Sequence, residues 1–493
     1  MKMIYGVKDR PKVGQLILFA LQQLLAILAA TIAVPMIVGN GMSISAALFG
    51  AGVGTIVYLL FTKFKSPVFL GSSFAFLGSM AAAFAGGVSA SLGYLGLIIG
   101  AIMAGLVYVI IAVVVKFAGV KWINKIMPAV VIGPTVAIIG LSLAGNAVGD
   151  LMKGNVTTDI TSWAIDFNEA GAPFLKEVVS SQMVCSPYAA LVCGLVTLGV
   201  TVACSVYGKK LMKMIPFIIG ILSGYILAAA FTGIGYAAKC DALKIINFEL
   251  FKNMQWYPDF AFVQLFKGKM AVEDGSIGAY IGSVAVAYIP VAFVVFAEHI
   301  ADHKNISSII EHDLLTDPGL TRTLLGDGVG SMAGAFFGGC PNTTYGESVG
   351  CVAISGNASV ITILVTAGLA ILFSFVAPFI TFLATIPSCV MGGVCVALYG
   401  FIAVSGLKMI QDVDLGDNKN LFVVSVILIT GVGGLVLTFG KVTITAVACA
   451  LILGILTNVL VNIKSKKNKN SGEQITIDEI ETAKEDSEPT EEK

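Results

Sequence analysis

The feature that most restricts the fold of this chain is a series of apolar runs, each about as long as a membrane is thick. A helix needs about 20 apolar residues to cross the hydrocarbon core of a bilayer. Uninterrupted runs of that kind lie near residues 14–38, 44–62, 93–116, 126–147, 187–207, 215–235, 278–297, 359–378, 387–407, 420–438 and 442–463. Two further stretches, 66–86 and 320–357, are apolar but interrupted by Pro and Gly. If the first holds one span and the second holds two, fourteen spans are expected.

Composition supports a chain that lives in a membrane. Of the 493 residues, 57% are apolar and only 12% are charged, and the mean hydropathy is +0.91. A soluble globular protein carries about 25% charged residues. We therefore predict an all-α polytopic membrane protein of the cell membrane, in contact with lipid. The formal net charge is zero, so no basic field argues for a nucleic-acid partner.

The charges in the loops predict the orientation. Short loops on the cytoplasmic side of a membrane protein are enriched in Lys and Arg. With fourteen spans and both termini cytoplasmic, the basic clusters fall on one side: 2–12, Lys63 and Lys65, Lys116 to Lys125, Lys209 to Lys213, and 464–469. Residues 1–13 are then a cytoplasmic N-terminus. Residues 464–493 are polar and acidic, which predicts a disordered cytoplasmic tail.

The nine cysteines give no sign of a metal site or a disulfide framework. They contain no C-x-x-C pair, and nearly all lie within apolar runs: 185, 193, 204, 240, 340, 351, 389, 395 and 449. Cysteine in such a place is a small core residue. We expect no bound metal and no cofactor.

Two pairs of similar segments indicate an internal repeat. MPAVVIGPTVAIIG (127–140) resembles IPSCVMGGVCVALYG (386–400), and SPVFLGSSFAF (66–76) resembles CPNTTYGESVG (340–350). Both pairs keep the same order, so a seven-span unit is predicted to occur twice. The repeats would cover 14–235 and 278–463, joined by an extracellular loop at 236–277. An odd number of spans inverts the second copy relative to the first.

The interrupted segments predict the place of a binding site. Inverted repeats build transporters whose site lies at the bilayer midplane on discontinuous helices. Extended backbone at that depth is tolerated only when it lines a cavity or is buried in protein. Pro67 and Pro341 lack an N–H, and the residues after them favour extended structure. Helices that restart after Gly71 and Gly346 would direct unpaired N–H groups at the centre. Two merely kinked helices are the alternative.

Acidic residues lie where a membrane span would exclude them. FVVFAEHIADH (293–303) ends a long apolar run, and its Glu298 and Asp302 share one helix face. Glu347 lies in the second interrupted segment. An ionisable group inside the bilayer costs several kcal/mol and suggests a function. His299 fits a structural role better, and His303 to Asp313 are expected in a cytoplasmic loop, 303–320.

Two buried carboxyl groups suit a proton-coupled carrier. In a medium of low dielectric constant, beside another carboxyl, such a group can hold a proton near neutral pH. It then donates a hydrogen bond and, after losing the proton, accepts one. A neutral planar solute with adjacent N–H and C=O groups matches that arrangement. The driving ion would be H⁺.

At these residues the sequence resembles the uracil permeases of the nucleobase–ascorbate transporter family. The shared motifs run from GVKDRP and LQQLLAILAATIAVP through LGSSFAF, AEHIADH, DLLTDPGL and PNTTYGES to PSCVMGGVCVALYG. The resemblance implies fourteen spans in two inverted repeats of seven, divided into a core domain and a gate domain. It also implies short antiparallel strands in the broken spans 3 and 10, proton-coupled uptake of a nucleobase such as uracil, and a homodimer.

The resemblance also implies roles for individual residues. Phe74 would line the substrate pocket, and Glu298 would hydrogen-bond the base and couple the proton. Gly346 and Glu347 would contact the base through a backbone N–H and a carboxylate. Weaker candidates complete the set: Ala30, Tyr345 and Tyr399 as pocket walls, and Asp302 and His299 for proton coupling.

Five positions depart from the family pattern, and two of them are Ser355 and Gly356, where the family often has Thr and Arg. Gln23 stands where a Gln-His pair usually provides His, and Asp302 stands where some uracil permeases have His. Ser348 follows Glu347 where Asn is common. These changes concern the substrate contacts and the proton relay, and they leave the two-carboxylate centre as it is.

Four other functions stay open on the sequence. A purine or xanthine permease of the same family usually has Gln in place of Glu347. A sulfate or bicarbonate transporter shares the architecture, although two carboxylates would repel an anion. A membrane-embedded enzyme would need a metal, for which the histidines within 299–312 have unusual spacing. A passive channel is harder to exclude; only uptake against a gradient distinguishes it from a coupled carrier. A non-enzymatic uracil importer is the favoured interpretation.

Overall fold

Helices make up most of the chain in the computed structural model, which describes residues 3–85, 87–119, 127–167, 173–209, 211–272, 276–439 and 442–463. Nine helices of that part are long and apolar enough to cross a membrane. A tenth span is obtained if α15 (Val360–Phe373) and α16 (Ala377–Thr385), bent by 85°, count as one. The chain is therefore a mostly helical polytopic membrane protein. The predicted tail, 464–493, lies outside the described residues.

The long helices follow the predicted apolar runs. They are α1 (Val13–Val38), α2 (Ile44–Phe61), α4 (Ala90–Ala118), α6 (Ala129–Ser142) continued by α7 (Ala144–Asp150), α8 (Pro187–Tyr207), α10 (Pro216–Ala237), α12 (Ile277–Ile310), α17 (Ser388–Met409) and Ala446–Ile463. Local signals start several of them. Ser43, Ser89 and Ser276 accept a hydrogen bond from the first turn of α2, α4 and α12.

Shorter elements connect or interrupt these helices. Besides α13 (Leu320–Gly338), which has 19 residues, the further helices are shorter: η1 (Phe74–Phe76), α3 (Leu77–Ala83), α9 (Leu211–Met214), η2 (Asp241–Leu243), η3 (Phe248–Asn253), α11 (Ala261–Gln264), η4 (Leu315–Gly319), α14 (Gly346–Ser355) and α18 (Asn418–Val432). The strands are β1 (Leu70–Ser72), β2 (Thr157–Phe167), β3 (Pro173–Met183), β4 (Asn342–Thr344), β5 (Leu437–Phe439) and β6 (Val442–Ile444). Each strand pairs with one partner, as β1–β4, β2–β3 and β5–β6.

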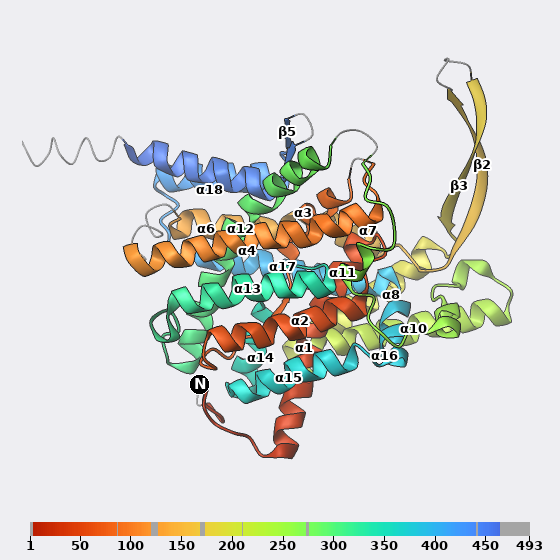
Figure 1. Cartoon of the computed structure of the whole chain (residues 1–493). Coiled ribbons are helices and arrows are strands. Elements are labelled where there is room, and N and C mark those ends of the chain that lie inside the picture. The colour runs from red at the N-terminus through yellow and green to blue at the C-terminus, as the bar shows by residue number, and fades with distance from the viewer. Residues whose placement is uncertain are drawn as a thin grey trace, which may run out of the picture.

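The helices pack in two groups. The first helix group contains α1 to α4 and α12 to α15, and the second contains α6, α7, α8, α10, α17 and α18. In the first group, α2, α4 and α13 run side by side (Figure 1). Contacts between the groups are fewer and involve α1, α12 and α14. The molecule therefore has two packed units with a seam between them.

Small residues let α2 and α13 approach closely. A Cβ added at Gly50 would lie 2.5 Å from the carbonyl oxygen of Gly334, and one at Gly330 would lie 2.8 Å from that of Gly54. Small residues spaced four apart are the usual means of close helix packing in membranes. This contact fixes the position of the strand β4, which follows α13 directly.

The strands β1 and β4 lie inside the first helix group and pair antiparallel. Their register joins Leu70 to Thr344, Gly71 to Thr343 and Ser72 to Asn342, and all six residues are buried. Neighbouring side chains satisfy the outer edge of β1, because the Leu70 N–H donates to the Thr55 hydroxyl at 2.9 Å. These strands occupy the two segments that Pro and Gly interrupt.

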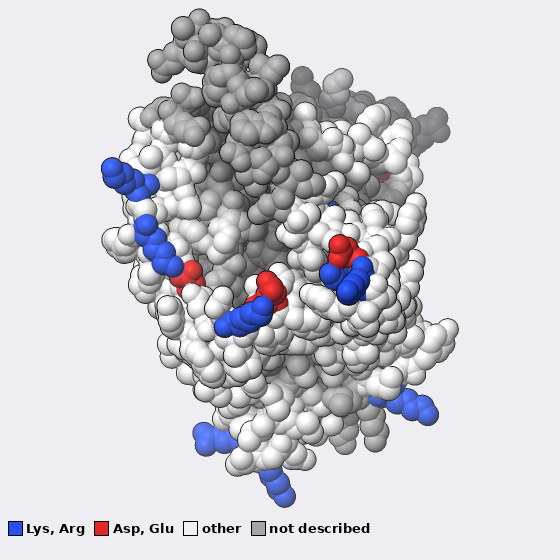
Figure 2. Space-filling view, turned by 90° about the vertical axis from the view of Figure 1, so that its right-hand side faces the viewer, with Lys and Arg blue, Asp and Glu red and all other residues white. Residues whose placement is uncertain are grey.

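The end of the molecule at the right of Figure 1 carries the β2–β3 hairpin, which stands away from the helices. The helix α10 also extends to this end. Figure 2 looks onto this face, where the acidic patches near the centre of the view each adjoin a basic one. Acidic and basic side chains form ion pairs in the segments from 150 to 267, as Lys153–Asp150, Lys244–Asp241, Lys252–Glu249 and Lys267–Asp259.

One predicted boundary was wrong. The sequence placed the end of a span near residue 297 and put His303 in a cytoplasmic loop. Instead α12 continues to Ile310, and His303 is completely buried. The apolar run ends early because the following polar side chains face other protein segments, where polar groups can be hydrogen-bonded. Glu311, His312 and Asp313 do lie in an exposed connection.

Candidate functional site

Two helices begin where the paired strands end, in the middle of the molecule. After β1 the chain turns into η1 at Phe74, and after β4 it turns into α14 at Gly346. Tyr345 holds the two turns together, because its N–H donates to the Phe69 carbonyl at 3.2 Å and its hydroxyl donates to the Ser72 carbonyl at 2.8 Å. The first N–H groups of a helix lack partners within it. Two helix starts therefore meet at one place.

A cavity of about 300 Å³, here called the central cavity, lies beside these helix starts. Its lining combines the first helix group with the second. The first group contributes Ala26, Phe74, Glu298, Ala301, Asp302, Asn305, Thr343, Thr344, Tyr345, Gly346, Glu347, Gly350, Cys351 and Ile354, and the second contributes Val136, Ser205, Phe217, Phe401, Ile402 and Ser405. Lys213 of α9 and Pro216, the first residue of α10, complete it.

Three carboxyl groups share this cavity. Glu298 and Asp302 lie one turn apart on α12, and Glu347 lies in the first turn of α14. The Thr344 hydroxyl donates to Asp302 Oδ2 at 2.7 Å, which ties α12 to β4. Among the described residues of the lining, Lys213 is the one cationic side chain, and it is exposed. The centre is therefore acidic, with its single base toward solvent.

The predicted site residues divide into three sets. Six of them line the central cavity: Phe74, Glu298, Asp302, Tyr345, Gly346 and Glu347. Tyr399 is not in the lining, but its ring packs edge-to-face on that of Phe74, with the ring centroids 5.5 Å apart. Ala30 is buried in α1, one turn beyond Ala26. His299 points away from the cavity.

Two departures from the family pattern contact each other. Gln23 on α1 donates a short hydrogen bond to the Ser348 hydroxyl on α14. The same hydroxyl accepts a hydrogen bond from the Phe69 N–H at 3.2 Å. Gln23 therefore positions the turn that carries Glu347. The sequence could not show this contact, because 325 residues separate the two side chains.

His299 belongs to a polar cluster behind the cavity. Its Nδ1 lies 2.7 Å from Asp327 Oδ2 and its Nε2 lies 3.0 Å from Thr323 Oγ1, and both partners are on α13. The Thr323 hydroxyl donates to the Leu320 carbonyl, so His299 Nε2 carries a hydrogen and donates to Thr323. One proton then lies between His299 and Asp327. The pair has no net charge, which explains how it tolerates complete burial.

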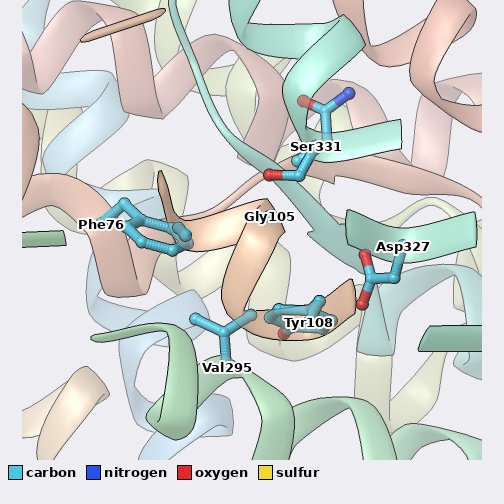
Figure 3. Close-up of a pocket in the computed structure, with 8 residues that line it drawn as sticks. Phe76, Gly105, Tyr108, Val295, Asp327 and Ser331 are labelled. Atoms are coloured by element: carbon cyan, nitrogen blue, oxygen red, sulfur yellow. The ribbon is translucent and has the colours of Figure 1, made fainter. Parts of the chain in front are cut away.

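Asp327 also borders a second, much smaller cavity. In Figure 3, the side chains of Asp327, Tyr108 and Ser331 surround it, with Phe76 and Val295 as apolar neighbours. Asp327 Oδ1 and the Tyr108 hydroxyl have no hydrogen-bond partner among the described residues. The cavity volume is about 10 Å³, a size that a single water molecule fits.

His303 extends the same cluster toward the loop between α2 and β1. Its Nδ1 donates to the His299 carbonyl at 2.8 Å, and its Nε2 lies 2.7 Å from the Tyr58 hydroxyl. That hydroxyl also lies 2.7 Å from Ser66 Oγ. His303 is thus a fixed internal side chain that links α12 to α2.

Asp327 is the site-region residue that the sequence analysis missed. It lies in the apolar stretch that became α13, and only 1% of its side chain is exposed. The rule that singled out Glu298 and Glu347, an acid inside a span, applied equally to Asp327. In the stretch 320–357 the prediction rested on the Pro and Gly interruptions and on Glu347, and the acid among the small residues of GDGVGSMAG was missed.

A further cavity of about 370 Å³, here called the vestibule, lies toward the β2–β3 end of the molecule. Its lining contains Ala33, Met36, Ile37, Gly145, Asn146, Gly149, Asp150, Lys153, Ser388, Met391 and Cys395. Lys153 Nζ pairs with Asp150 Oδ1 at 3.0 Å. The vestibule is thus polar and electrically balanced, whereas the central cavity is acidic.

Comparison with known proteins agrees with a carrier site. Residues 14–170 and 164–439 match the Permease family. The uracil permease of Bacillus caldolyticus is 37% identical over 483 residues, 97% of this chain and 99% of that protein. The uracil permease of Bacillus subtilis is 35% identical and covers 96% and 98%. The uracil permease of Escherichia coli K12 is 34% identical, over 91% of this chain and 92% of that protein.

Solved structures share the fold at low sequence identity. The transmembrane domain of the cyanobacterial bicarbonate transporter BicA matches with a TM-score of 0.56 at 14% identity, over 92% of this chain and 99% of that one. The murine solute carrier 26 family member A9, an anion transporter in an inward-facing state, matches with a TM-score of 0.58 at 12% identity. The match covers 93% of this chain and 69% of that one.

Proposed function

The chain belongs to the Permease family and is a transporter rather than an enzyme, and from that premise we propose that it imports uracil together with protons. Uracil permeases from several bacteria align with nearly its whole length. The proposal places the solute in the central cavity and the protein in the cell membrane. Neither a cofactor nor a metal is needed for this activity.

The observation that carries the proposal is the meeting of Glu298, Glu347 and the start of α14 in one cavity. Uracil is a neutral planar ring whose edge alternates N–H and C=O groups. A carboxylate accepts from an N–H, a protonated carboxyl or a backbone N–H donates to a C=O, and Phe74 offers an apolar face. Gly346 leaves room for the base to approach the backbone.

The same carboxyl groups support proton coupling. Glu298, Asp302 and Glu347 line the same cavity, so their mutual repulsion favours at least one bound proton. In the proposed cycle Glu298 binds a proton and uracil on the outer side and releases both inside. Asp302 assists, since Thr344 holds it one turn away. In this proposal His299 has a structural role, because it shares a proton with Asp327.

The architecture proposed from the sequence has fourteen spans in two inverted repeats. The nine long helices supply nine, and α13, α15, α18 and the broken elements β1–α3 and β4–α14 supply five more. Pairing of β1 with β4 supports equivalent places for the broken elements. The basic connections would face the cytoplasm, as would both termini, so the vestibule would face outside. A homodimer in the membrane is part of the same proposal.

Alternating access would use the two helix groups as core and gate. The carboxyl groups belong to the first helix group, and the opposite wall of the cavity, including Phe401 and Ile402, belongs to the second. Displacement of one group against the other would open the seam to one side at a time. The central cavity reaches the exposed Lys213 and Asn305, so it is open toward the proposed inside.

A purine or xanthine permease is the second candidate, and an anion transporter is the third. Glu347 favours a pyrimidine, because purine-type members of the family usually have Gln there. The relatives in the solved structures carry bicarbonate and other anions, but three carboxyl groups in the cavity would repel an anion. Glu347→Gln should therefore weaken uracil binding and strengthen competition by xanthine.

Uptake of radiolabelled uracil into proteoliposomes tests the proposal. With the outside made acidic, we expect uracil to accumulate above its external concentration, and a protonophore should abolish the accumulation. Unlabelled uracil should compete strongly, xanthine weakly and bicarbonate not at all. Uptake that never exceeds equilibration would instead indicate a passive channel, and stronger competition by xanthine would identify the second candidate.

A further inference from the structure

Two cavities lie in series along the same helices. The helix α17 lines the vestibule with Ser388, Met391 and Cys395, and then lines the central cavity with Phe401, Ile402 and Ser405. The helix α1 does the same in the opposite direction, with Ala26 in the central cavity and Ala33, Met36 and Ile37 in the vestibule. The cavities are thus consecutive parts of one path.

A thin closed layer separates them. On α17 the stretch between the two sets, 396–400, contains one aromatic residue, Tyr399, which is 3% exposed. Its ring packs edge-to-face on Phe74, with an interplanar angle of 79°. On α1 the stretch between the two sets, 27–32, contains Ala30, which is completely buried. The layer is therefore made of two aromatic rings with a small residue beside them.

The two rings come from different helix groups. Phe74 is held by β1 and η1 in the first group, and Tyr399 is held by α17 in the second. Edge-to-face packing of aromatic rings is a weak, apolar contact. Movement of one group against the other can therefore separate the rings without breaking an ion pair.

We propose that Phe74 and Tyr399 form the outer closure of the transport path, and that the vestibule is its entrance. The inference rests on the proposed function and orientation and deepens them. A neutral planar solute would enter the vestibule, pass between the parted rings and reach Glu298 and Glu347. Tyr399 then acts as a positioning and sealing residue.

Native cysteines can report on each side of the closure. Cys395 lines the vestibule and Cys351 lines the central cavity. Ser405, which is exposed in the central cavity, gives a second inner reporter as Ser405→Cys. The probe is a membrane-impermeant methanethiosulfonate with a quaternary ammonium group, added outside whole cells. A cysteine thiolate attacks its sulfur, a disulfide forms and methanesulfinate leaves. Peptide mass spectrometry quantifies each cysteine.

With Tyr399 in place, we expect Cys395 to react from outside at least about tenfold faster than either inner reporter, because reaction follows thiol access. Tyr399→Ala should remove this protection, and Tyr399→Phe, which keeps the ring, should preserve it. Phe74→Ala removes the opposite ring and should act like Tyr399→Ala, so the test survives if one variant does not fold.

Three results would overturn the closure: equal labelling of inner and outer reporters with Tyr399 present, protection that persists in both alanine variants, or Cys395 protected while Cys351 reacts. Labelling needs no uracil, so it is independent of the uptake assay. Failure of uptake with the expected labelling would reject the proposed function and its solute. Failure of labelling with normal uptake would reject the closure alone.

Discussion

The two faces of α12 both carry polar side chains, but one face borders the central cavity and the other is buried against neighbouring helices. Glu298 and Asp302 face the central cavity, which is lined by three carboxyl groups. His299 and His303, each one residue further along, face α13 and α2 and are fully hydrogen-bonded and buried. Two helical turns, AEHIADH (297–303), therefore contain both the carboxyl groups of the site and the side chains that hold its wall in place.

This contrast separates two uses of polar groups inside a membrane protein. A group that is satisfied on every side, such as the proton-sharing pair His299–Asp327, holds helices in place. A group left among like charges can exchange a proton or bind a solute. Substitutions on the rear face should therefore reduce stability, whereas substitutions on the cavity face should reduce transport in a protein that still folds.

Asp327→Ala should have the largest effect. It leaves His299 Nδ1 buried without its partner, and breaking a buried charged pair costs about 3–5 kcal/mol. The midpoint of thermal unfolding in detergent should fall strongly. Asp327→Asn, which keeps the shape and a polar atom, should be less damaging. Normal stability of Asp327→Ala would show that the rear face does not fasten α12.

Glu298→Gln should come next, with an effect on transport. One charge that crosses 100 mV gains about 2.3 kcal/mol, which supports roughly fifty-fold accumulation of solute. Glutamine has nearly the same shape but no exchangeable charge, so uracil in proteoliposomes should only equilibrate. The unfolding midpoint should match that of the unaltered protein. Full pH-dependent accumulation by this variant would refute the coupling role.

Tyr58→Phe should have an intermediate effect, on stability only. It deletes the hydroxyl that lies 2.7 Å from both His303 Nε2 and Ser66 Oγ, and an unsatisfied buried partner costs about 1–3 kcal/mol. The ring itself remains. Uptake per folded molecule should be unchanged, so a transport defect at full stability would move Tyr58 to the functional face.

The smallest effect is expected at the exposed ion pair Lys65–Asp317. Lys65 follows α2, and Asp317 lies in η4, just before α13. The hydrogen bond from Lys65 at 2.6 Å, together with its charge, holds the pKa of the Asp317 carboxyl below its usual value. The pair therefore stabilises the fold above about pH 3.9, the usual value for Asp, and this contribution is lost as pH falls through the lowered pKa.

Surface pairs contribute little, because water and salt screen them. Asp317→Asn should leave the unfolding midpoint at pH 7 nearly unchanged, and it should remove only the part of the acid sensitivity that Asp317 contributes. A midpoint shift as large as that of Tyr58→Phe would contradict the distinction between buried and exposed pairs.

Much of the site could be predicted from the sequence. The apolar runs located the long helices, and the Pro and Gly interruptions located β1 and β4. Acids within spans pointed to Glu298 and Glu347, which lie in one cavity. Asp327 carried the same signal but was hidden by the glycines of α13. Gln23 with Ser348 could not be predicted, because each looked like an unrelated departure.

The sequence by itself determined that this chain enters a membrane, where its helices break, and which acids a bilayer would not tolerate without a reason. Only the tertiary structure decided which way each side chain faces. A helix that is apolar nearly all round has no amphipathic stripe to fix its rotation, so neighbouring helices set it through packing. That rotation directed Glu298 into the cavity and His299 onto Asp327.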